Sequence, residues 1–245
     1  MSASRNDAIS VANGEFIMFL DSDDMYLPQT CEYVYEKIKQ DNPDIVCFGY
    51  SNNVKLMEKL ARRGGKAKLG NIIANQVFIW NKAFRKTFLT ERGIKFPVGV
   101  KTAEDIVFCC LCYFCNPKYS YIPKSLYLYT TKRENSATNQ SAYCIENDMK
   151  AYKVISESNL YKSADKAVRL LIANHFLSGS VRYWNTWTVE EYREKYLSDI
   201  ENFLDLVKSQ FSFVDCFRIN RFRKLLVIIY RNKLTRYFNK HKINL

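Results

Sequence analysis

Five apolar residues in a row, at positions 16–20, run directly into three carboxylates, Asp21, Asp23 and Asp24. A glycine precedes the run and a polar turn follows it, a pattern typical of a strand buried on both faces. In an open α/β sheet, ligands bind just beyond the carboxyl ends of such strands. The stretch therefore predicts an α/β fold with a binding site at this acidic turn, residues 21–24.

Carboxylates this close together repel one another and raise each other's pKa values unless a cation neutralises them. A hard divalent ion, Mn²⁺ or Mg²⁺, that itself carries a phosphate ligand is a natural partner. The same pattern also suits an acidic turn whose carboxylates stay in water, with Asp23 or Asp24 capping the next helix. Spacing alone leaves both interpretations open.

Helical and extended patterns alternate through the first 140 residues. We expect helices over residues 4–12, 28–40, 82–89 and 104–115, and strands over 16–20, 45–48, 77–80, 119–122 and 126–130. Pro123 separates the last two strands, because proline cannot donate to a sheet ladder. The first two strands and the helix between them make a βαβ unit.

The pattern changes near residue 140. From there on it is helical only, with helices expected over residues 143–158, 163–184, 189–209 and 216–239. We therefore expect two domains, an α/β domain over residues 1–140 and a helical, basic region over residues 141–245.

Four motifs in the first domain follow one another in a recognisable order. They are S-A-S-R-N with A-N-G-E-F-I-M-F-L-D-S-D-D-M-Y-L-P over 2–28, W-N-K with A-F-R over 80–85, E-D-I-V-F over 104–108, and Y-L-Y with R-E-N-S over 127–136. Together they closely resemble family 2 glycosyltransferases. The resemblance implies a partial GT-A fold, Rossmann-like with a mostly parallel sheet, in a sugar-transferring enzyme.

The resemblance also assigns roles to the acids. It implies that Asp23 binds the metal ion that carries the diphosphate of a nucleotide-sugar donor, and that Asp21 contacts the nucleoside or a water on the metal. Asp105 is then the general base that deprotonates the acceptor hydroxyl, and Glu104 orients it. Acids at the start of a helix are also favoured by the helix dipole, so capping explains one of this pair equally well.

Four further residues are candidates for ligand contacts. Arg5 and Asn6 are placed to reach the donor diphosphate, and Arg133 is able to pair with its oxygens. Trp80 suits stacking on an acceptor sugar. The alternatives are surface cations for the two arginines and simple core packing for Trp80.

Something is missing before the first strand. In the resembled family, two further βαβ-type units precede this segment and hold the base and ribose of the nucleotide. At about 30 residues per unit, we expect on the order of 60 or more residues upstream. We accordingly expect an N-terminally truncated member that binds nucleotide-sugar weakly or not at all.

The net charge of +12 is unevenly placed. Residues 216–245 carry nine lysines and arginines and no acid, while the rest is close to balanced, which argues against a nucleic-acid-binding body. Basic and apolar residues alternate there at helical spacing, so the segment suits either an anionic membrane surface or a last core helix with a solvated cationic face. The chain has no run of 18 apolar residues, and its eight cysteines follow no framework. We expect a cytoplasmic protein, peripheral at the inner face of the cell membrane.

The leading hypothesis is a metal-dependent, inverting glycosyltransferase. It moves a sugar from a nucleotide-sugar donor to a hydroxyl of a surface polysaccharide or lipid-linked glycan. A catalytically impaired fragment that binds a membrane or a protein partner is the alternative outside the enzymes. A phosphatase of the haloacid dehalogenase type also places D-x-D after a strand, but it usually has a small residue and threonine where this chain has Asp24 and Met25.

Overall fold

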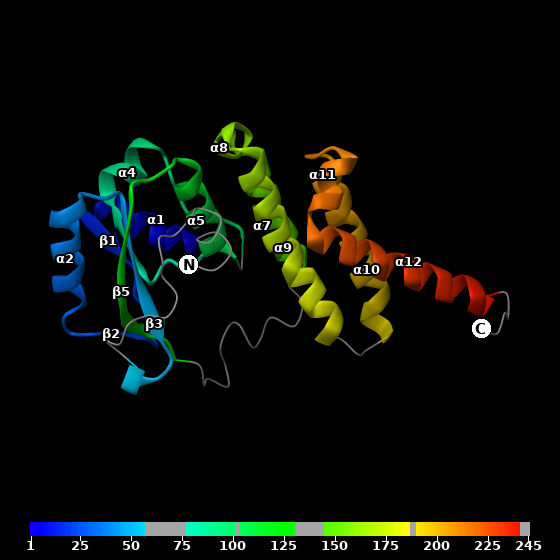
Figure 1. The fold of residues 1–245 in the computed structure, drawn as a ribbon, viewed down its shortest axis with the longest axis horizontal. Helices are drawn as coiled ribbons and strands as arrows, with labels where there is room; N and C mark the ends of the chain where they lie inside the picture. Colours follow the sequence, from blue (N-terminus) through cyan, green and yellow to red (C-terminus); the bar gives the residue numbers. More distant parts are fainter. Residues whose placement is uncertain (57–76, 101–102, 131–144, 187–189, 241–245) are drawn as a thin grey trace. The chain divides into compact units, whose positions relative to one another are not determined.

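The computed structural model describes residues 1–56, 77–100, 103–130, 145–186 and 190–240. By its internal contacts the chain divides into a first unit, Met1–Ser141, and a second unit, Ala142–Leu245 (Figure 1). The division falls one residue beyond the boundary expected from the change of pattern.

A five-stranded sheet in the order β1-β4-β3-β5-β2 forms the centre of the first unit. Its strands are β1 Phe16–Met18, β2 Met25–Tyr26, β3 Ile45–Ser51, β4 Lys82–Arg85 and β5 Tyr119–Leu128. Only β3 and β5 pair in parallel, whereas β1 and β3 both run antiparallel to β4, and β2 runs antiparallel to β5. The α/β class is confirmed, but over the described strands the sheet is mixed rather than mostly parallel.

The first strand differs from its expected form. β1 is three residues long, with Ile17 buried and its neighbours Phe16 and Met18 only partly so. Leu20, at the end of the apolar run, is 53% exposed. Among the described strands β1 stands at the edge of the sheet and pairs only with β4, so the prediction of a strand buried on both faces is wrong.

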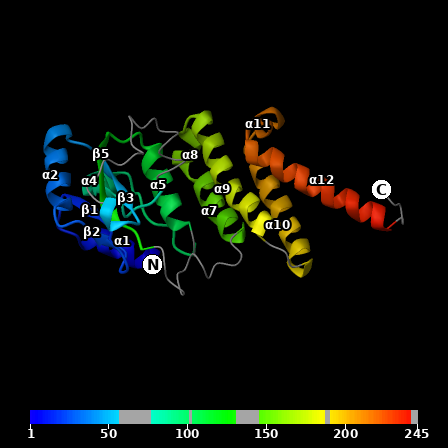
Figure 2. The same ribbon diagram turned by 60° about the horizontal axis from the view of Figure 1, so that its bottom comes forward.

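Helices cover both faces of this sheet. They are α1 Ser2–Val11, α2 Thr30–Asp41, α4 Lys86–Glu91 and α5 Glu104–Phe114, with a 3₁₀ turn, η1 Val54–Leu56. Figure 1 and Figure 2 both show α2 and α5 on opposite sides of β3 and β5. α5 is apolar and packs inward, and Phe108 stacks on Phe96 with ring centroids 4.0 Å apart.

Two local predictions between residues 77 and 89 are wrong. Residues 77–80 form no strand, and Lys82–Arg85 is a strand rather than the start of a helix. Lys, Ala and Arg favour helices, but this segment pairs with β1 on one side and β3 on the other. These two ladders outweigh the local preference.

Pro123 lies inside one continuous strand instead of separating two. Along β5, Ile122 pairs with Phe48 and Ser125 pairs with Gly49, so Pro123 and its neighbour fall in a register shift. A bulge of this kind leaves a residue outside the ladder, and it therefore tolerates the missing N–H of proline.

The second unit is helical. Its helices are α7 Ile145–Glu157, α8 Asn159–Ser163, α9 Lys166–Thr186, α10 Glu190–Lys208, α11 Phe213–Arg218 and α12 Asn220–Lys240. α9 packs against α7 and α12, and α10 packs against the same two helices. Tyr152 lies at the centre, fully buried, with its hydroxyl 3.1 Å from the hydroxyl of Tyr161.

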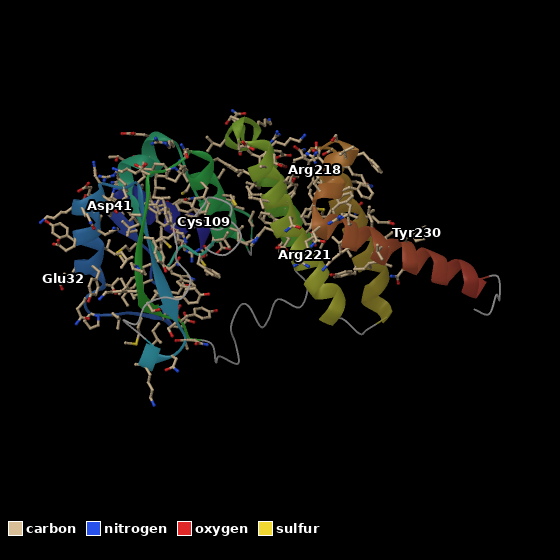
Figure 3. All side chains as sticks on the ribbon, in the orientation of Figure 1. Glu32, Asp41, Cys109, Arg218, Arg221 and Tyr230 are labelled. Atoms are coloured by element: carbon tan, nitrogen blue, oxygen red, sulfur yellow. The ribbon has the colours of Figure 1, made fainter. Side chains whose placement is uncertain are left out.

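The basic tail was expected to be one helix over residues 216–239, and this is wrong. The extended backbone of Ile219 separates α11 from α12, with Arg218 and Arg221 on either side of the break (Figure 3). Phe222, Leu225 and Ile229, the apolar stripe of α12, are buried in the unit. The apolar stripe therefore belongs to a core helix.

The opposite face of α12 is open to solvent. It carries Arg223 and Lys224, with Val227 and Tyr230 further along at helical spacing. None of the helices in the described part of the chain combines the length and apolarity needed to cross a membrane.

Candidate active site

One arginine joins three of the predicted site acids. The guanidinium of Arg5 donates to Asp105 over 2.7 Å and to Glu104 over 3.0 Å, and it lies 3.5 Å from Asp21. Its side chain is only 13% exposed. The beginning of the chain, the acidic turn and the first turn of α5 therefore meet at one point.

Local structure fixes the position of each partner. Arg5 lies in the second turn of α1, and the next residue, Asn6, anchors this helix through both its side-chain groups. Its amide donates to the Phe96 carbonyl over 3.0 Å and accepts from the Phe96 N–H over 2.8 Å. Asn6 is thus committed to this backbone segment, and its predicted contact with a donor diphosphate stays a prediction.

The acids of α5 follow an unusual backbone turn. Ala103, the N-cap of α5, has a φ of 68°, in the left-handed region that residues with a Cβ seldom adopt. Strain of this kind persists where the surrounding structure imposes it, and it gathers at functional sites. Here it turns the chain so that Glu104 and Asp105 both face Arg5.

The electrostatics of the site favour a proton on Asp105. Burial raises the pKa of this carboxyl to about 7, although the Arg5 guanidinium acts in the opposite direction. Burial likewise raises the pKa of Asp21, with further contributions from Asp24 and Asp23. A carboxyl with a pKa near neutrality can both accept and release a proton under ordinary conditions, as a general base must.

The acidic turn is itself held from β5. Asp24 is buried and accepts from the Tyr127 hydroxyl over 2.6 Å and from the Thr130 N–H over 2.8 Å. The Thr130 hydroxyl donates to the Asp23 carbonyl over 2.7 Å. Both oxygens of Asp24 are therefore occupied, and its role is to fix the turn.

The remaining acids fit a divalent cation that arrives with its own ligands. The described residues contain no group of three or more metal-binding side chains. Mg²⁺ and Mn²⁺, however, are commonly held by one or two carboxylates together with phosphate oxygens and water. Asp21 and Asp23 are carboxylates of the kind such an ion uses; the pKa of Asp21 is raised mainly by burial, with smaller contributions from Asp24 and Asp23.

Trp80 takes the core position rather than a surface one. It is 4% exposed and stacks on Tyr127 with ring centroids 4.4 Å apart. Its carbonyl accepts from the Tyr26 hydroxyl over 3.0 Å. Core packing, one of the two alternatives for this residue, is what the structure shows, and its predicted contact with an acceptor sugar stays a prediction.

The structure thus brings Arg5, Asp21, Glu104 and Asp105 together, while Arg133 lies outside the described residues. Sequence reasoning missed Tyr127 and Thr130, which hold the acidic turn. The Y-L-Y motif that contains Tyr127 was a signal for the first of them, but nothing in the sequence linked it to Asp24.

Comparison with known proteins finds similarity to glycosyltransferases. Residues 1–103 match the family model described as Glycosyl transferase family 2. The matched range includes the acidic turn and Trp80, and it ends just before Glu104 and Asp105.

Two relatives of known activity are similar over most of the chain. The poly(ribitol-phosphate) beta-N-acetylglucosaminyltransferase TarP of Staphylococcus aureus is 26% identical over 82% of this chain and 64% of its own length. A poly(ribitol-phosphate) beta-glucosyltransferase of Bacillus spizizenii is 26% identical over 95% of this chain and 38% of its own. The chain thus spans between about two-fifths and two-thirds of the length of these relatives.

A solved structure shares the fold. Residues 1–349 of Staphylococcus aureus TarS, crystallised in complex with UDP-GlcNAc, superpose with a TM-score of 0.71 at 20% identity. The match covers 98% of this chain and 72% of the other. At this identity the likeness concerns the fold.

Proposed function

We propose that this chain, whose residues 1–103 match the model of glycosyl transferase family 2 and whose fold resembles that of a glycosyltransferase, transfers a sugar from a nucleotide-sugar donor to a hydroxyl acceptor. The observation that carries the proposal is the convergence of Asp21, Glu104 and Asp105 on Arg5. The Arg5 guanidinium thereby contacts both Asp21, in the turn proposed to hold the donor, and Asp105, the candidate base.

Asp105 is the general base of the proposed reaction. Its carboxylate takes the proton of the acceptor hydroxyl as the oxygen attacks the anomeric carbon, and the donor diphosphate leaves from the opposite face. This single displacement inverts the configuration at the anomeric carbon. A base with a pKa near 7 matches the operating pH, where general base catalysis is most effective.

Glu104 and Arg5 position this base. Glu104 shares the guanidinium with Asp105, so Arg5 holds both carboxylates at the start of α5. The same guanidinium is a bidentate donor of the type that binds phosphate oxygens. Arg5 therefore also serves the leaving diphosphate when a donor is present.

Asp23 and Asp21 would hold Mn²⁺ or Mg²⁺ together with the donor diphosphate. The ion, when bound, supplies a positive charge that stabilises the diphosphate as the glycosidic bond breaks. Asp24 contributes by keeping the turn in place through Tyr127 and Thr130.

The relatives suggest the class of acceptor. Both are named for transfer to poly(ribitol-phosphate), a cell-surface polymer. We propose a surface polysaccharide or lipid-linked glycan as the acceptor of this chain. These matches favour a transferase over the alternative of a fragment that only binds a membrane or a partner.

The outer face of α12 supports a contact with an anionic membrane, where a lipid-linked acceptor is found. Arg223 and Lys224 are exposed there, beside Val227 and Tyr230. Because the apolar stripe is buried in the second unit, the proposed contact is electrostatic and stays at the membrane surface. We propose the cytoplasmic face of the membrane for this contact.

The test is donor turnover by the whole 245-residue chain. The assay supplies UDP-GlcNAc or UDP-glucose at millimolar concentration, because the sequence predicts weak nucleotide binding, with Mn²⁺ and a synthetic ribitol-phosphate oligomer. Release of UDP that depends on the acceptor supports the proposal, and Asp105→Asn should lower it by about 10²- to 10⁴-fold while Asp7→Asn, an exposed acid of α1, should leave it unchanged. No release above the Asp105→Asn background with either donor contradicts it.

A further inference from the structure

A stack of aromatic rings extends from the core of the first unit to its surface. Tyr127, Phe78 and Tyr129 lie nearly parallel to Trp80, with centroids 4.4, 4.8 and 5.6 Å from it. Tyr50 meets the same ring edge-on, with centroids 4.8 Å apart and planes at 89°. The rings come from β3, from the end of β5 and from the segment before β4.

One end of the stack is buried and the other is exposed to solvent. Trp80 and Tyr127 are buried, whereas Phe78 and Tyr129 are partly exposed and Tyr50 is 42% exposed. Among the described residues, the hydroxyls of Tyr50 and Tyr129 have no hydrogen-bond partner. Both tyrosines present part of their ring surface to solvent. We call Tyr50, Phe78 and Tyr129 the aromatic platform.

The platform adjoins the acidic turn directly. Thr130, the residue after Tyr129, donates to Asp24 over 2.8 Å through its N–H and to the Asp23 carbonyl over 2.7 Å through its hydroxyl. Tyr127, stacked under Trp80, donates to Asp24 as well. The backbone that carries the platform is thus the backbone that fixes the candidate donor site.

We propose that the aromatic platform binds a pyranose ring of the acceptor glycan, next to the hydroxyl that receives the new sugar. The inference rests on the proposed transfer to a hydroxyl acceptor. The face of an aromatic ring is electronegative and attracts the polarised C–H bonds on the face of a sugar ring. The phenol hydroxyls suit hydrogen bonds to the hydroxyls at the sugar's edge.

The geometry favours a sugar over the flat base of a nucleotide. Tyr129 lies nearly parallel to Trp80, at 13°, while Tyr50 stands at 89° to it, so the planes of the two tyrosines are close to perpendicular and form no flat slot. A puckered ring with apolar faces and polar edges suits such an arrangement. A planar base would contact only one of the two tyrosines with its face.

Saturation-transfer NMR tests this without requiring catalysis. The whole chain is mixed with methyl β-glucopyranoside, with uridine and with ribitol in separate samples, each at millimolar concentration. We expect saturation at the ring C–H protons of the glucoside. Changing Tyr50→Leu and Tyr129→Leu should each weaken its binding by about threefold to tenfold, the range expected for loss of one aromatic contact.

Matched variants separate binding from folding. Tyr129→Phe keeps the ring and should keep most of the signal, and Tyr35→Leu on α2, an exposed tyrosine away from the platform, should leave it unchanged. No glucoside signal in the wild-type chain, an equal signal in the two leucine variants, or saturation of uridine or ribitol without the glucoside would each overturn the proposal. The binding signal needs no turnover, so a failure of catalysis and a failure of this subsite give different results.

Discussion

Arg5 and Asp105 are separated by 100 positions in the sequence, yet the guanidinium of one donates to the carboxylate of the other over 2.7 Å. This ion pair joins α1 to the first turn of α5. Arg5 and Lys82 are the cations that act on Asp105 among the described residues, and we propose that a donor diphosphate competes for Arg5. Charge balance at the site is therefore expected to change when a donor binds.

Replacing Arg5 by alanine should affect stability in a pH-dependent way. The change leaves the carboxylates of Glu104 and Asp105 close together without their cation, at a cost of about 1–3 kcal/mol when both are ionised. Because Asp105 can take up a proton, the cost should be smaller at pH 5 than at pH 8. Urea unfolding at the two pH values measures the difference. Arg92→Ala, which removes an arginine of the same unit outside the site, should show no such dependence.

Asp105 should make stability and activity change in opposite directions with pH. Its pKa is about 7 in the folded chain against an ordinary 3.8, so the folded state binds the proton more tightly than the unfolded state. The stabilisation is complete below pH 3.8 and is lost as the pH rises through 7, whereas the activity of a general base rises over the same range.

The variant that checks this is Asp105→Asn. It should flatten the fall in unfolding free energy between about pH 4 and 7 and lower turnover by about 10²- to 10⁴-fold. A carboxyl ¹³C titration of the wild-type chain should show one aspartate with a midpoint near 7 that is missing in the variant. A midpoint near 4 for every aspartate would contradict the prediction.

Metal binding should depend on Asp23 and Asp21 and hardly at all on Asp24. Paramagnetic broadening by Mn²⁺ in the presence of UDP should fall in Asp23→Ala and disappear on addition of EDTA. Asp7→Ala, an exposed acid of the same unit, serves as the control. Broadening that survives in both Asp23→Ala and Asp21→Ala would exclude the acidic turn as the metal site.

The Tyr127 hydroxyl should stabilise the acidic turn. Tyr127→Phe removes a single oxygen and leaves one lone pair of the buried Asp24 carboxylate without a partner. We expect a loss of about 1–3 kcal/mol in unfolding free energy. Tyr121→Phe, a partly exposed tyrosine of the same strand, is the matched change and should cost less. Equal losses would mean that the bond to Asp24 contributes nothing particular.

Membrane contact should respond to charge on the outer face of α12. The double change Arg223→Glu and Lys224→Glu should weaken binding to anionic vesicles, because each cation near such a surface contributes about 1 kcal/mol. Lys150→Glu with Lys153→Glu on α7 alters the net charge equally and should have less effect. Deleting the tail would be a poor test, since Phe222, Leu225 and Ile229 belong to the core. Equal binding of the two double variants would contradict a specific face.

The sequence predicts the class of fold and much of the site, because those signals are local. The apolar run before Asp21, the acids at the start of α5 and the helical pattern after residue 141 can each be recognised within a few turns of chain. The convergence of Asp21 and Asp105 follows once both motifs are placed at the same edge of an α/β sheet.

What the sequence does not reveal depends on partners far away in the chain. Lys82–Arg85 has the composition of a helix and becomes a strand because β1 and β3 lie on either side of it. The segment before it looks like a strand, but side chains satisfy its carbonyls, with Tyr26 donating to Trp80 and Lys82 to Phe78. Neither outcome can be read from a short window of residues.

The position of β4 between β1 and β3 determines when the site can form during folding. β1 has no partner among the described strands until β4 has been added to the sheet, and Arg5 lacks its two shorter ion pairs, to Glu104 and Asp105, until α5 is in place. Closing loops of this length lowers the entropy of the chain before the long-range contacts form. Topologies of this kind therefore fold slowly. On the ribosome, the acidic turn lacks its contacts with β5 until the more than one hundred residues between Asp24 and Tyr127 have been made. The candidate site is therefore among the last parts of the first unit to assemble.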